Sequence, residues 1–255
     1  MTVQSFAYIQ RVIQEKGLGY VAEVGFKYYS AYFVHFVLAP VYYFKLKALP
    51  ASLSIQKTLA FVNQECQGAF KPLQIESEIT QLLKHVKKLK PKVVVEIGSA
   101  NGGTLFSMIK QSPSDTTFVS IDLPGGTFGG GYAWYKIFLF KAFVKAQQSI
   151  HLLRSDSHAQ STKDELVEVL AGRKVDFLFI DGDHTYEGVK QDYELYSPLV
   201  KKGGWIGFHD IVHHRSELQC EVDIFWKEVK KKRQFVEFVE DWEQGLCGIG
   251  LIKVR

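Results

Sequence analysis

The chain has 255 residues, a length that allows one substantial α/β domain with an appended segment. Hydrophobic residues make up 46% and charged residues 23%, which is ordinary for a packed globular protein and excludes an intrinsically disordered chain. The formal net charge is only +4, and much of the basic excess lies in two short runs at the ends of predicted helices, residues 85–90 and 230–233, so no nucleic-acid-binding surface is predicted.

The cysteines favour a reducing compartment. Cys66, Cys220 and Cys247 are widely spaced and include no CxxC pair, so their spacing predicts neither a disulfide framework nor a zinc site. The N-terminus lacks a basic stretch followed by an apolar core, and no secretory signal is expected. We therefore expect a cytoplasmic protein.

A sharp change in aromatic density near residue 50 divides the chain. Residues 1–50 are predicted to form a helical, aromatic-rich extension, and residues 51–255 the ligand-binding α/β domain. The extension begins with an amphipathic helix that stops near Gly17.

Within the extension, the apolar segment 31–44 is interrupted by Pro40. The segment is short for a membrane span, which needs about 20 apolar residues. Two interpretations stay open for residues 20–46. One is a helix that packs on the α/β domain or on a second copy in a homo-oligomer, and the other is a peripheral contact with a membrane or a lipid substrate.

From residue 53 onward, predicted helices and strands alternate, which indicates βαβ units. The helices are expected at 54–66, 76–89, 103–111, 134–148, 162–170 and 186–196, and the strands at 93–97, 117–121, 151–154, 175–180 and 205–208. Two further strand-like segments, 235–239 and 248–254, are expected to form an antiparallel hairpin. The predicted fold is therefore a doubly wound, mostly parallel α/β sheet of seven strands, similar to a Rossmann fold, that carries an N-terminal helical extension.

In such a sheet, ligands bind outside the carboxyl ends of the strands, where the strand order reverses. The first cluster at this position is the turn from Glu96 to Thr104, with glycines at positions 98, 102 and 103. Glycine lets the backbone turn tightly and approach a ligand. The turn fits the dinucleotide pattern GxGxxG poorly, because Ala100 stands two residues after the first glycine. On its own, such a turn could also merely cap a helix.

Carboxylates follow the next two predicted strands. Asp122 comes directly after strand 117–121, where it can accept both hydrogen bonds of a ribose diol. Asp156 and Ser157 follow strand 151–154, where they could hold an adenine edge. The alternative is that these residues only cap the turns and helices that follow.

The most specific cluster follows strands 175–180 and 205–208: Asp181-Gly182-Asp183-His184, and later Gly207-Phe208-His209-Asp210. With these motifs, residues 93–211 resemble class I S-adenosylmethionine-dependent methyltransferases. The resemblance is to the small-molecule O-methyltransferase branch that includes macrolide-sugar methyltransferases and cephalosporin-hydroxylase-like proteins. Residues 1–50 lie outside it.

The resemblance implies a role for each cluster at a cofactor site. The methionine part of S-adenosylmethionine (SAM) would contact Glu96, Gly98, Ser99 and Gly102. The ribose would contact Asp122, and the adenine would contact Asp156 and Ser157. It also implies a divalent metal, held by an acid after the fourth strand and an acidic pair after the fifth.

The metal ligands would be Asp181, His209 and Asp210. Neighbouring parallel strands lie about 4.8 Å apart, so these residues can converge. Two carboxylates that meet in a cleft repel unless a proton or a cation lies between them, and Mg²⁺ is the first candidate. His209 stands where relatives often carry a second acid, so it either becomes an imidazole ligand, favouring manganese, iron or zinc, or leaves the metal shell.

His184 is the candidate general base, with Asp181 as the second catalytic residue, because an imidazole titrates near neutral pH. The alternative is that His184 only caps the helix at 186–196; His213 and His214 are weaker candidates for the base. The glycine-rich loop 123–133 is a predicted lid, with Phe128 and Tyr132 shielding the transfer from water.

These inferences predict metal-assisted O-methylation of a hydroxyl on a sugar, a glycoconjugate or another small polar compound. One alternative is a metal-independent methyltransferase, in which Asp181 and Asp210 only position the substrate. Another is a non-catalytic nucleotide-binding or scaffold protein with the same fold. A redox enzyme is disfavoured, because no facial triad of metal ligands is recognisable.

Overall fold

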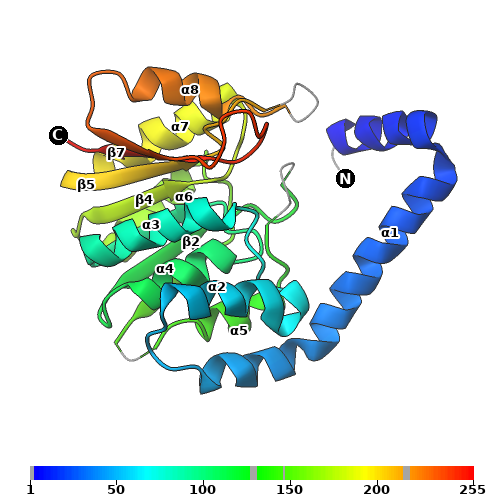
Figure 1. The fold of residues 1–255 in the computed structure, drawn as a ribbon, viewed down its shortest axis with the longest axis horizontal. Helices are drawn as coiled ribbons and strands as arrows, with labels where there is room; N and C mark the ends of the chain where they lie inside the picture. Colours follow the sequence, from blue (N-terminus) through cyan, green and yellow to red (C-terminus); the bar gives the residue numbers. More distant parts are fainter. Residues whose placement is uncertain (1–2, 127–130, 146, 215–218) are drawn as a thin grey trace.

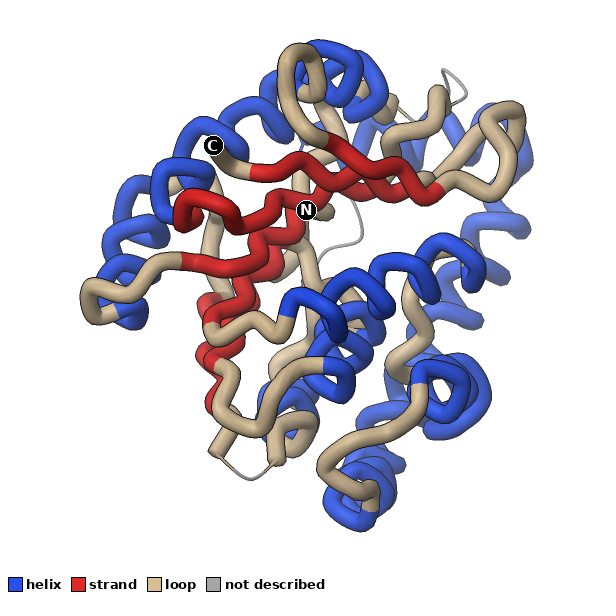
Figure 2. Tube along the Cα trace, turned by 60° about the vertical axis from the view of Figure 1, so that its left-hand side comes forward, coloured by secondary structure: helices blue, strands red, loops and turns tan. Residues whose placement is uncertain are grey.

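The described residues form a single seven-stranded sheet with helices on both faces (Figures 1 and 2). The computed structural model describes residues 3–126, 131–145, 147–214 and 219–255. In chain order the strands are β1 (Val93–Ile97), β2 (Thr117–Ile121), β3 (Ser149–Leu153), β4 (Val175–Ile180), β5 (Val200–His209), β6 (Phe235–Phe238) and β7 (Ile249–Lys253).

The strand order is β3-β2-β1-β4-β5-β7-β6. The first five strands pair in parallel, whereas β7 runs antiparallel to both β5 and β6. This confirms the predicted doubly wound sheet with an antiparallel C-terminal pair. The order reverses between β1 and β4, which places the ligand-binding switch point at the carboxyl ends of these two strands.

The helices divide into two layers. They are α1 (Val3–Ala48), α2 (Ile55–Gln64), α3 (Glu76–Leu89), α4 (Gly103–Gln111), α5 (Lys136–Lys141), α6 (Gln160–Leu170), α7 (Tyr186–Tyr196) and α8 (Val222–Val229), with 3₁₀ turns η1 (Glu65–Gly68) and η2 (Ser197–Leu199). Buried side chains of α1 to α5 share one core with one face of the sheet, and those of α6, α7 and α8 share another with the opposite face.

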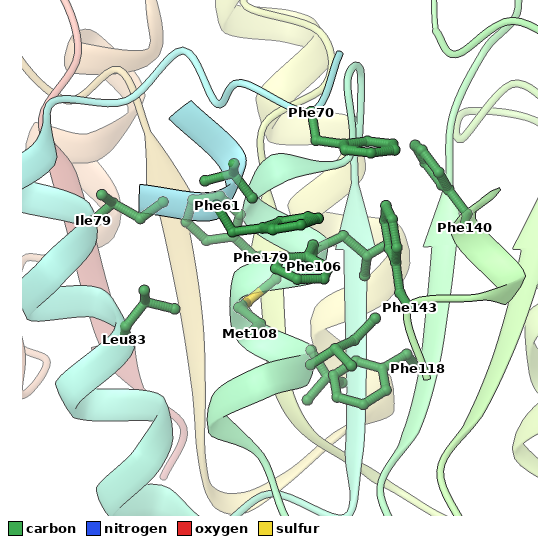
Figure 3. Packing of buried hydrophobic residues seen from close by; sticks show 14 of the residues in the cluster. Phe61, Phe70, Ile79, Leu83, Phe106, Met108, Phe118, Phe140, Phe143 and Phe179 are labelled. Carbon is green, nitrogen blue, oxygen red and sulfur yellow. The ribbon is translucent and has the colours of Figure 1, made fainter. Parts of the chain in front are cut away.

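Alternation along the strands separates these two cores. Val94 of β1 packs toward α1 to α5, while Val93 and Val95 pack toward α6 to α8. The first core is unusually aromatic (Figure 3): the rings of Phe61 and Phe106 stack with centroids 5.1 Å apart. Such ring pairs contribute roughly 0.5–1.5 kcal/mol beyond the area that they bury.

The extension is helical, as predicted, and Gly17 interrupts it. The backbone at Gly17 has φ 84° and ψ 159°, outside the helical region, and the chain then resumes its helix up to Ala48. Pro40 lies inside this second part. Near its C-terminus, α1 packs on the body of the molecule through buried Tyr42 and Leu46. The interpretation of a helix packed on the α/β domain therefore holds for this end of α1.

The middle of α1 projects away from the sheet and leaves apolar side chains in solvent (Figure 1). The exposed ones are Phe26, Tyr29, Tyr32, Phe33, Val34, Phe36, Val37, Val41 and Phe44. Among the residues that the structure describes, no helix is long and apolar enough to cross a membrane. Contact of residues 20–46 with a membrane surface or with a second copy stays a prediction.

The predicted helix at 134–148 is much shorter in the structure, where α5 spans only Lys136–Lys141. The chain leaves the helix at Ala142 so that Phe143 can stack on Phe140, with ring centroids 4.8 Å apart. Here tertiary packing of aromatic side chains overrides the helical spacing in the sequence.

Lys136 offers a test of this core through its pH dependence. Its buried Nζ donates hydrogen bonds to the backbone oxygen of Ala69 at 2.7 Å and to Asn101 Oδ1 at 3.0 Å. Burial lowers the pKa of Lys136 from 10.5 to about 8. The charged amine therefore lowers the free energy of unfolding. This loss decreases as the pH rises from about 8 toward 10.5 and the amine of the folded state is neutral.

We expect the free energy of unfolding to rise over this pH window in the wild type and to rise less in Lys136→Met. Urea denaturation at pH values on both sides of about 8 measures the difference. Lys141→Met, an exposed change on the same helix, is the matched control and should retain the wild-type slope. If the free energy of unfolding rose equally with pH in all three proteins, the charge of Lys136 would not be destabilised by burial.

Candidate active site

The carboxyl ends of β1 to β4 surround a cavity of about 240 Å³. It is lined by Ile97, Gly98, Ala100, Ile121, Asp122, Leu123, Gly126, Gly131, Ser155, Asp156, Ser157, His158, Asp181, Gly182 and Asp183. The four predicted clusters therefore meet at one site, although they are far apart in the sequence. Of the predicted cofactor-binding residues, those at 98, 122, 156 and 157 line this cavity.

Gly98 makes the first turn possible. Its φ is 84°, and a Cβ at this position would lie 1.8 Å from the backbone oxygen of Asp181. Its N–H donates a hydrogen bond of 2.9 Å to the oxygen of Ile121. The turn after β1 is therefore pressed between the ends of β2 and β4, where a side chain has no room.

Gly102 has a different role from the predicted one. It caps the N-terminus of α4 with φ 82°, and an added Cβ would lie 2.3 Å from the ring of Phe140. It lines neither this cavity nor the second one described below. Glycine is required at position 102 because the backbone packs closely on the ring of Phe140.

Glu96 lies beneath the turn and does not line either cavity. Its Oε2 accepts a hydrogen bond of 2.5 Å from Ser99 Oγ, which also lies 2.7 Å from Ser120 Oγ. Burial raises the pKa of Glu96 well above its usual range. The predicted contact with the methionine part of a cofactor can therefore pass only through Ser99, which lines the second cavity.

Asp122 lies at the first cavity, and its contact with a ribose stays a prediction. One oxygen, Oδ2, accepts a hydrogen bond of 2.6 Å from the N–H of Ala100, and the carboxylate lines the cavity. Burial raises the pKa of Asp122 to about 6, against the lowering effect of the backbone hydrogen bonds from Ala100 and Ser99. At neutral pH it is therefore a charged acceptor, held in place by the glycine turn.

Gly131, near the end of the glycine-rich loop, lies directly against the carboxylate of Asp122. An added Cβ at Gly131 would lie 2.8 Å from Asp122 Oδ1, so the loop needs a glycine there. Of the two aromatic residues of the predicted lid, Phe128 lies outside the described residues. Tyr132 is buried, with its ring 4.5 Å from that of Phe140, and so belongs to the core.

Of the two predicted roles of Asp156, the structure shows the cap, and the contact with adenine stays a prediction. Its Oδ1 accepts a hydrogen bond of 2.9 Å from the N–H of His158, so it caps the turn after β3 while it lines the cavity. The turn is fixed from below, because the hydroxyl of Tyr196 donates a 2.6 Å hydrogen bond to the oxygen of Ser157.

A second cavity, of about 400 Å³, adjoins the first. Gly98, Ala100 and Asp181 line both. The second cavity is also lined by Lys71, Pro72, Leu73, Gln74, Ser99, Asn101, Gly103, Thr104, His184, His209, Asp210, His214, Cys220, Leu246 and Cys247. A group held in one cavity can therefore face a group held in the other across Asp181.

The predicted metal ligands converge, but an imidazole already lies between the carboxylates. His209 Nδ1 is 3.1 Å from Asp181 Oδ1 and 3.2 Å from Asp210 Oδ1. Burial opposes a charged imidazole, but the two carboxylates raise the pKa of His209 well above its usual range. An imidazolium thus supplies the positive charge that was assigned to a metal, and these three residues do not fit an oxygen-ligated Mg²⁺ ion.

His184 also pairs with Asp210. Its Nδ1 lies 2.7 Å from Asp210 Oδ2, while its Nε2 is 4.0 Å from Asp181 Oδ1. Burial favours the neutral imidazole, but hydrogen bonds with Asp210 and Cys220 raise the pKa of His184 to about 10. At neutral pH it carries a proton, which a general base must first lose. Of the weaker candidates, His213 is largely exposed and pairs with Asp223, and only His214 lines the cavity.

Comparison with known proteins identifies a segment that contributes to both cavities. Residues 95–211 match the sequence profile of a family described as a methyltransferase domain. They also contain most of β1, all of β2 to β5, and the four motifs described above. Over this segment the chain is similar to a methyltransferase domain.

Solved structures share the fold of the methyltransferase domain. An O-methyltransferase from Bacillus cereus in complex with SAH (S-adenosylhomocysteine) superposes with a TM-score of 0.52 at 13% identity, over 82% of this chain and 93% of that chain. The O-methyltransferase TomG from Streptomyces achromogenes, involved in tomaymycin synthesis and in complex with SAM, gives 0.50 at 14% identity, over 81% and 92%. At these identities the likeness establishes the fold.

Two curated proteins resemble the chain in sequence. The uncharacterized protein R132 of Acanthamoeba polyphaga mimivirus is 51% identical over 121 residues, which are 48% of this chain and 52% of that protein. The uncharacterized protein y4gI of Sinorhizobium fredii is 26% identical over 128 residues, 49% of this chain and 14% of that protein. The chain therefore matches about half the length of the first relative and a smaller share of the second.

Sequence reasoning missed several residues that lie at this site. Gln74 Nε2 donates a 3.0 Å hydrogen bond to Asp181 Oδ2, and its Oε1 accepts one of 2.7 Å from Thr104 Oγ1. Cys220 and Cys247 line the second cavity. None of these residues follows a predicted parallel strand, so the carboxyl-end rule does not point to them.

Proposed function

We propose that this methyltransferase domain transfers the methyl group of SAM to a hydroxyl oxygen of a small polar compound. The observation that carries the proposal is the pair of adjoining cavities that share Gly98 and Asp181 at the switch point of the sheet. The first cavity would hold the cofactor, and the second would hold the acceptor. SAM and SAH in the related O-methyltransferase structures support this choice of cofactor.

Within the first cavity, the polar groups support one orientation of the cofactor. Asp122 would accept the hydrogen bonds of the ribose diol, and the turn at residues 155–158 would enclose the adenine. The methionine part would then follow Gly98 and Ser99 toward the second cavity. This direction brings the sulfonium close to the carboxylate of Asp181, which favours its positive charge.

The acceptor cavity suits a hydroxyl compound. Polar side chains of Lys71, Gln74 and Thr104 line it together with Asp181, and its volume matches a small molecule. A sugar or glycoconjugate, as the sequence predicts, is the finer form of this proposal. The acceptor hydroxyl would donate a hydrogen bond to Asp181, whose carboxylate is oriented by Gln74 and His209.

Methyl transfer needs the acceptor oxygen in line with the methyl carbon and removal of the hydroxyl proton. Asp181 is the candidate that lines both cavities, and His184 stays the second candidate for accepting the proton. Asp181→Asn and His184→Gln separate the two. The residue that takes the proton is the one whose replacement lowers kcat more than it raises KM.

Isothermal titration calorimetry with SAM and with SAH, each with and without Mg²⁺, tests the proposal. We expect one molecule of either ligand to bind per chain, followed by transfer of a labelled methyl group to a member of a panel of sugars and other hydroxylated metabolites. Absence of binding by both ligands would rule out the proposal. Tight binding without transfer to any acceptor would favour a scaffold protein, and transfer that survives EDTA would favour the metal-independent enzyme.

A further inference from the structure

One wall of the second cavity carries two histidines, an aspartate and a cysteine whose polar atoms face one another. His184 Nδ1 lies 2.7 Å from Asp210 Oδ2, and His214 Nε2 lies 3.1 Å from Asp210 Oδ1. The thiol of Cys220 forms hydrogen bonds with both imidazoles. The four side chains therefore close a ring, which we call the Cys220 cluster: His184, Asp210, His214 and Cys220.

Three of these four side chains are as close together as the ligands of a metal site. The donor atoms of His184, Asp210 and Cys220 lie within 4.8 Å of one another. Asp210 and His214 are buried, with 5% and 7% of their surface exposed. Although His214 Nε2 is close to Asp210, it makes no well-aligned hydrogen bond with a described residue, so a buried donor atom is left for another partner.

We propose that the Cys220 cluster binds one transition-metal dication, Zn²⁺ by preference, through the three converging donors of His184, Asp210 and Cys220, with the adjacent imidazole of His214 as the fourth ligand. Such a nitrogen, oxygen and sulfur set is typical of tetrahedral zinc, whereas Mg²⁺ takes oxygen ligands. It differs from the predicted site at Asp181, His209 and Asp210, because only Asp210 is common to both.

A second group competes for Asp210. The donor atoms of His209, Asp210 and Cys247 also lie within 4.8 Å of one another, and all three residues are buried. His209, however, is held between the carboxylates of Asp181 and Asp210. In the Cys220 cluster only Asp210 is engaged in that pair, so we assign the ion to this cluster.

The position of the cluster indicates what the ion does. His184 precedes α7, Asp210 follows β5, His214 lies on the loop after it, and Cys220 precedes α8. An ion with four protein ligands would join these segments and fix one wall of the acceptor cavity, as closed structural sites do. This effect on the acceptor rests on the proposed function, whereas metal binding itself does not. With His184 as a ligand, Asp181 is left to meet the acceptor hydroxyl.

Titration of the tag-free, reduced, chelator-treated full chain with Co²⁺ tests the site by absorption spectroscopy. We expect one Co²⁺ per chain, with the intense visible bands of a tetrahedral ion and a thiolate-to-cobalt charge-transfer band, and displacement of both by Zn²⁺. Cys220→Ser should abolish the thiolate band. His214→Asn should weaken Co²⁺ binding at least about tenfold, since even the loss of a residue that only supports a ligand often costs that much.

Matched controls locate the site. His213→Asn, which changes the exposed neighbour of His214, and Cys247→Ser, in the competing group, should both retain the wild-type spectrum. The thiolate band surviving in Cys220→Ser, its loss in Cys247→Ser, or no Co²⁺ binding by the wild type would each overturn the assignment.

SAH binding, measured on the same samples, separates this proposal from the preceding one. The Cys220 cluster lies outside the lining of the first cavity, so SAH should bind Cys220→Ser as it binds the wild type if the variant is folded. Metal binding without SAH binding would refute only the methyltransferase proposal, and the reverse result would refute only the metal site.

Discussion

Asp122→Asn is expected to weaken the binding of SAM and SAH about 30-fold, equivalent to roughly 2 kcal/mol, because it removes charge-assisted hydrogen bonds to the ribose. The backbone hydrogen bond from Ala100 needs only an oxygen acceptor, which asparagine can still offer. The glycine turn should therefore keep its shape. Isothermal titration calorimetry at neutral pH measures the change in affinity.

Asp115→Asn is the matched control for this prediction. Asp115 is an exposed carboxylate that pairs with Lys92 just before β2, at the opposite end of the strand from Asp122. Its replacement should leave the affinity for SAH unchanged. Equal affinity of the wild type and Asp122→Asn for SAH would show that Asp122 does not bind the ribose.

The pH dependence of binding gives a second signature of Asp122. Because its pKa is raised to about 6, the wild type should lose affinity as the pH falls through this value and the carboxylate takes up a proton. The affinity of Asp122→Asn should change less over the same range. Parallel pH profiles would show that another group is responsible.

The largest effect on stability is expected for Gly98→Ala, which should cost more than about 3 kcal/mol or prevent folding. The added Cβ would lie 1.8 Å from the backbone oxygen of Asp181 and 2.8 Å from the Cα of Gly182. Backbone atoms cannot move aside as a flexible side chain can, so β1 and β4 would have to separate. Urea denaturation measures the loss.

Gly172→Ala separates this clash from the cost of the backbone conformation. Gly172 has φ 81°, close to the 84° of Gly98, but an added Cβ there meets nothing within 4 Å. It should therefore cost only about 1–2 kcal/mol, the penalty for an L-residue in a left-handed conformation. Similar losses in the two variants would mean that the close approach of β1 and β4 is not what demands glycine.

The parallel core of the fold was predictable because its strands are short apolar runs between clear turns. The predicted strands 93–97, 117–121 and 175–180 have the bounds of β1, β2 and β4. The helix at 134–148 was predicted too long, since the aromatic spacing that suggests it serves packing between Phe140 and Phe143. Periodicity cannot distinguish these two origins.

The site was predictable to the extent that it follows the parallel strands. The carboxyl-end rule placed Asp122, Asp156 and Asp181 in one cavity, because it depends only on strand order. It could not place Gln74, which precedes α3 and is more than 100 residues from its partner Asp181. Nor could spacing reveal Cys220, whose partners His184 and Asp210 come from other parts of the chain.

A crystal structure of the chain with bound SAH tests the central claim most directly. The account predicts that the ribose hydroxyls meet Asp122, that the adenine lies in the turn at residues 155–158, and that the sulfur faces Asp181 at the entrance to the second cavity. SAH bound elsewhere, or in the first cavity with its ribose away from Asp122, would contradict it.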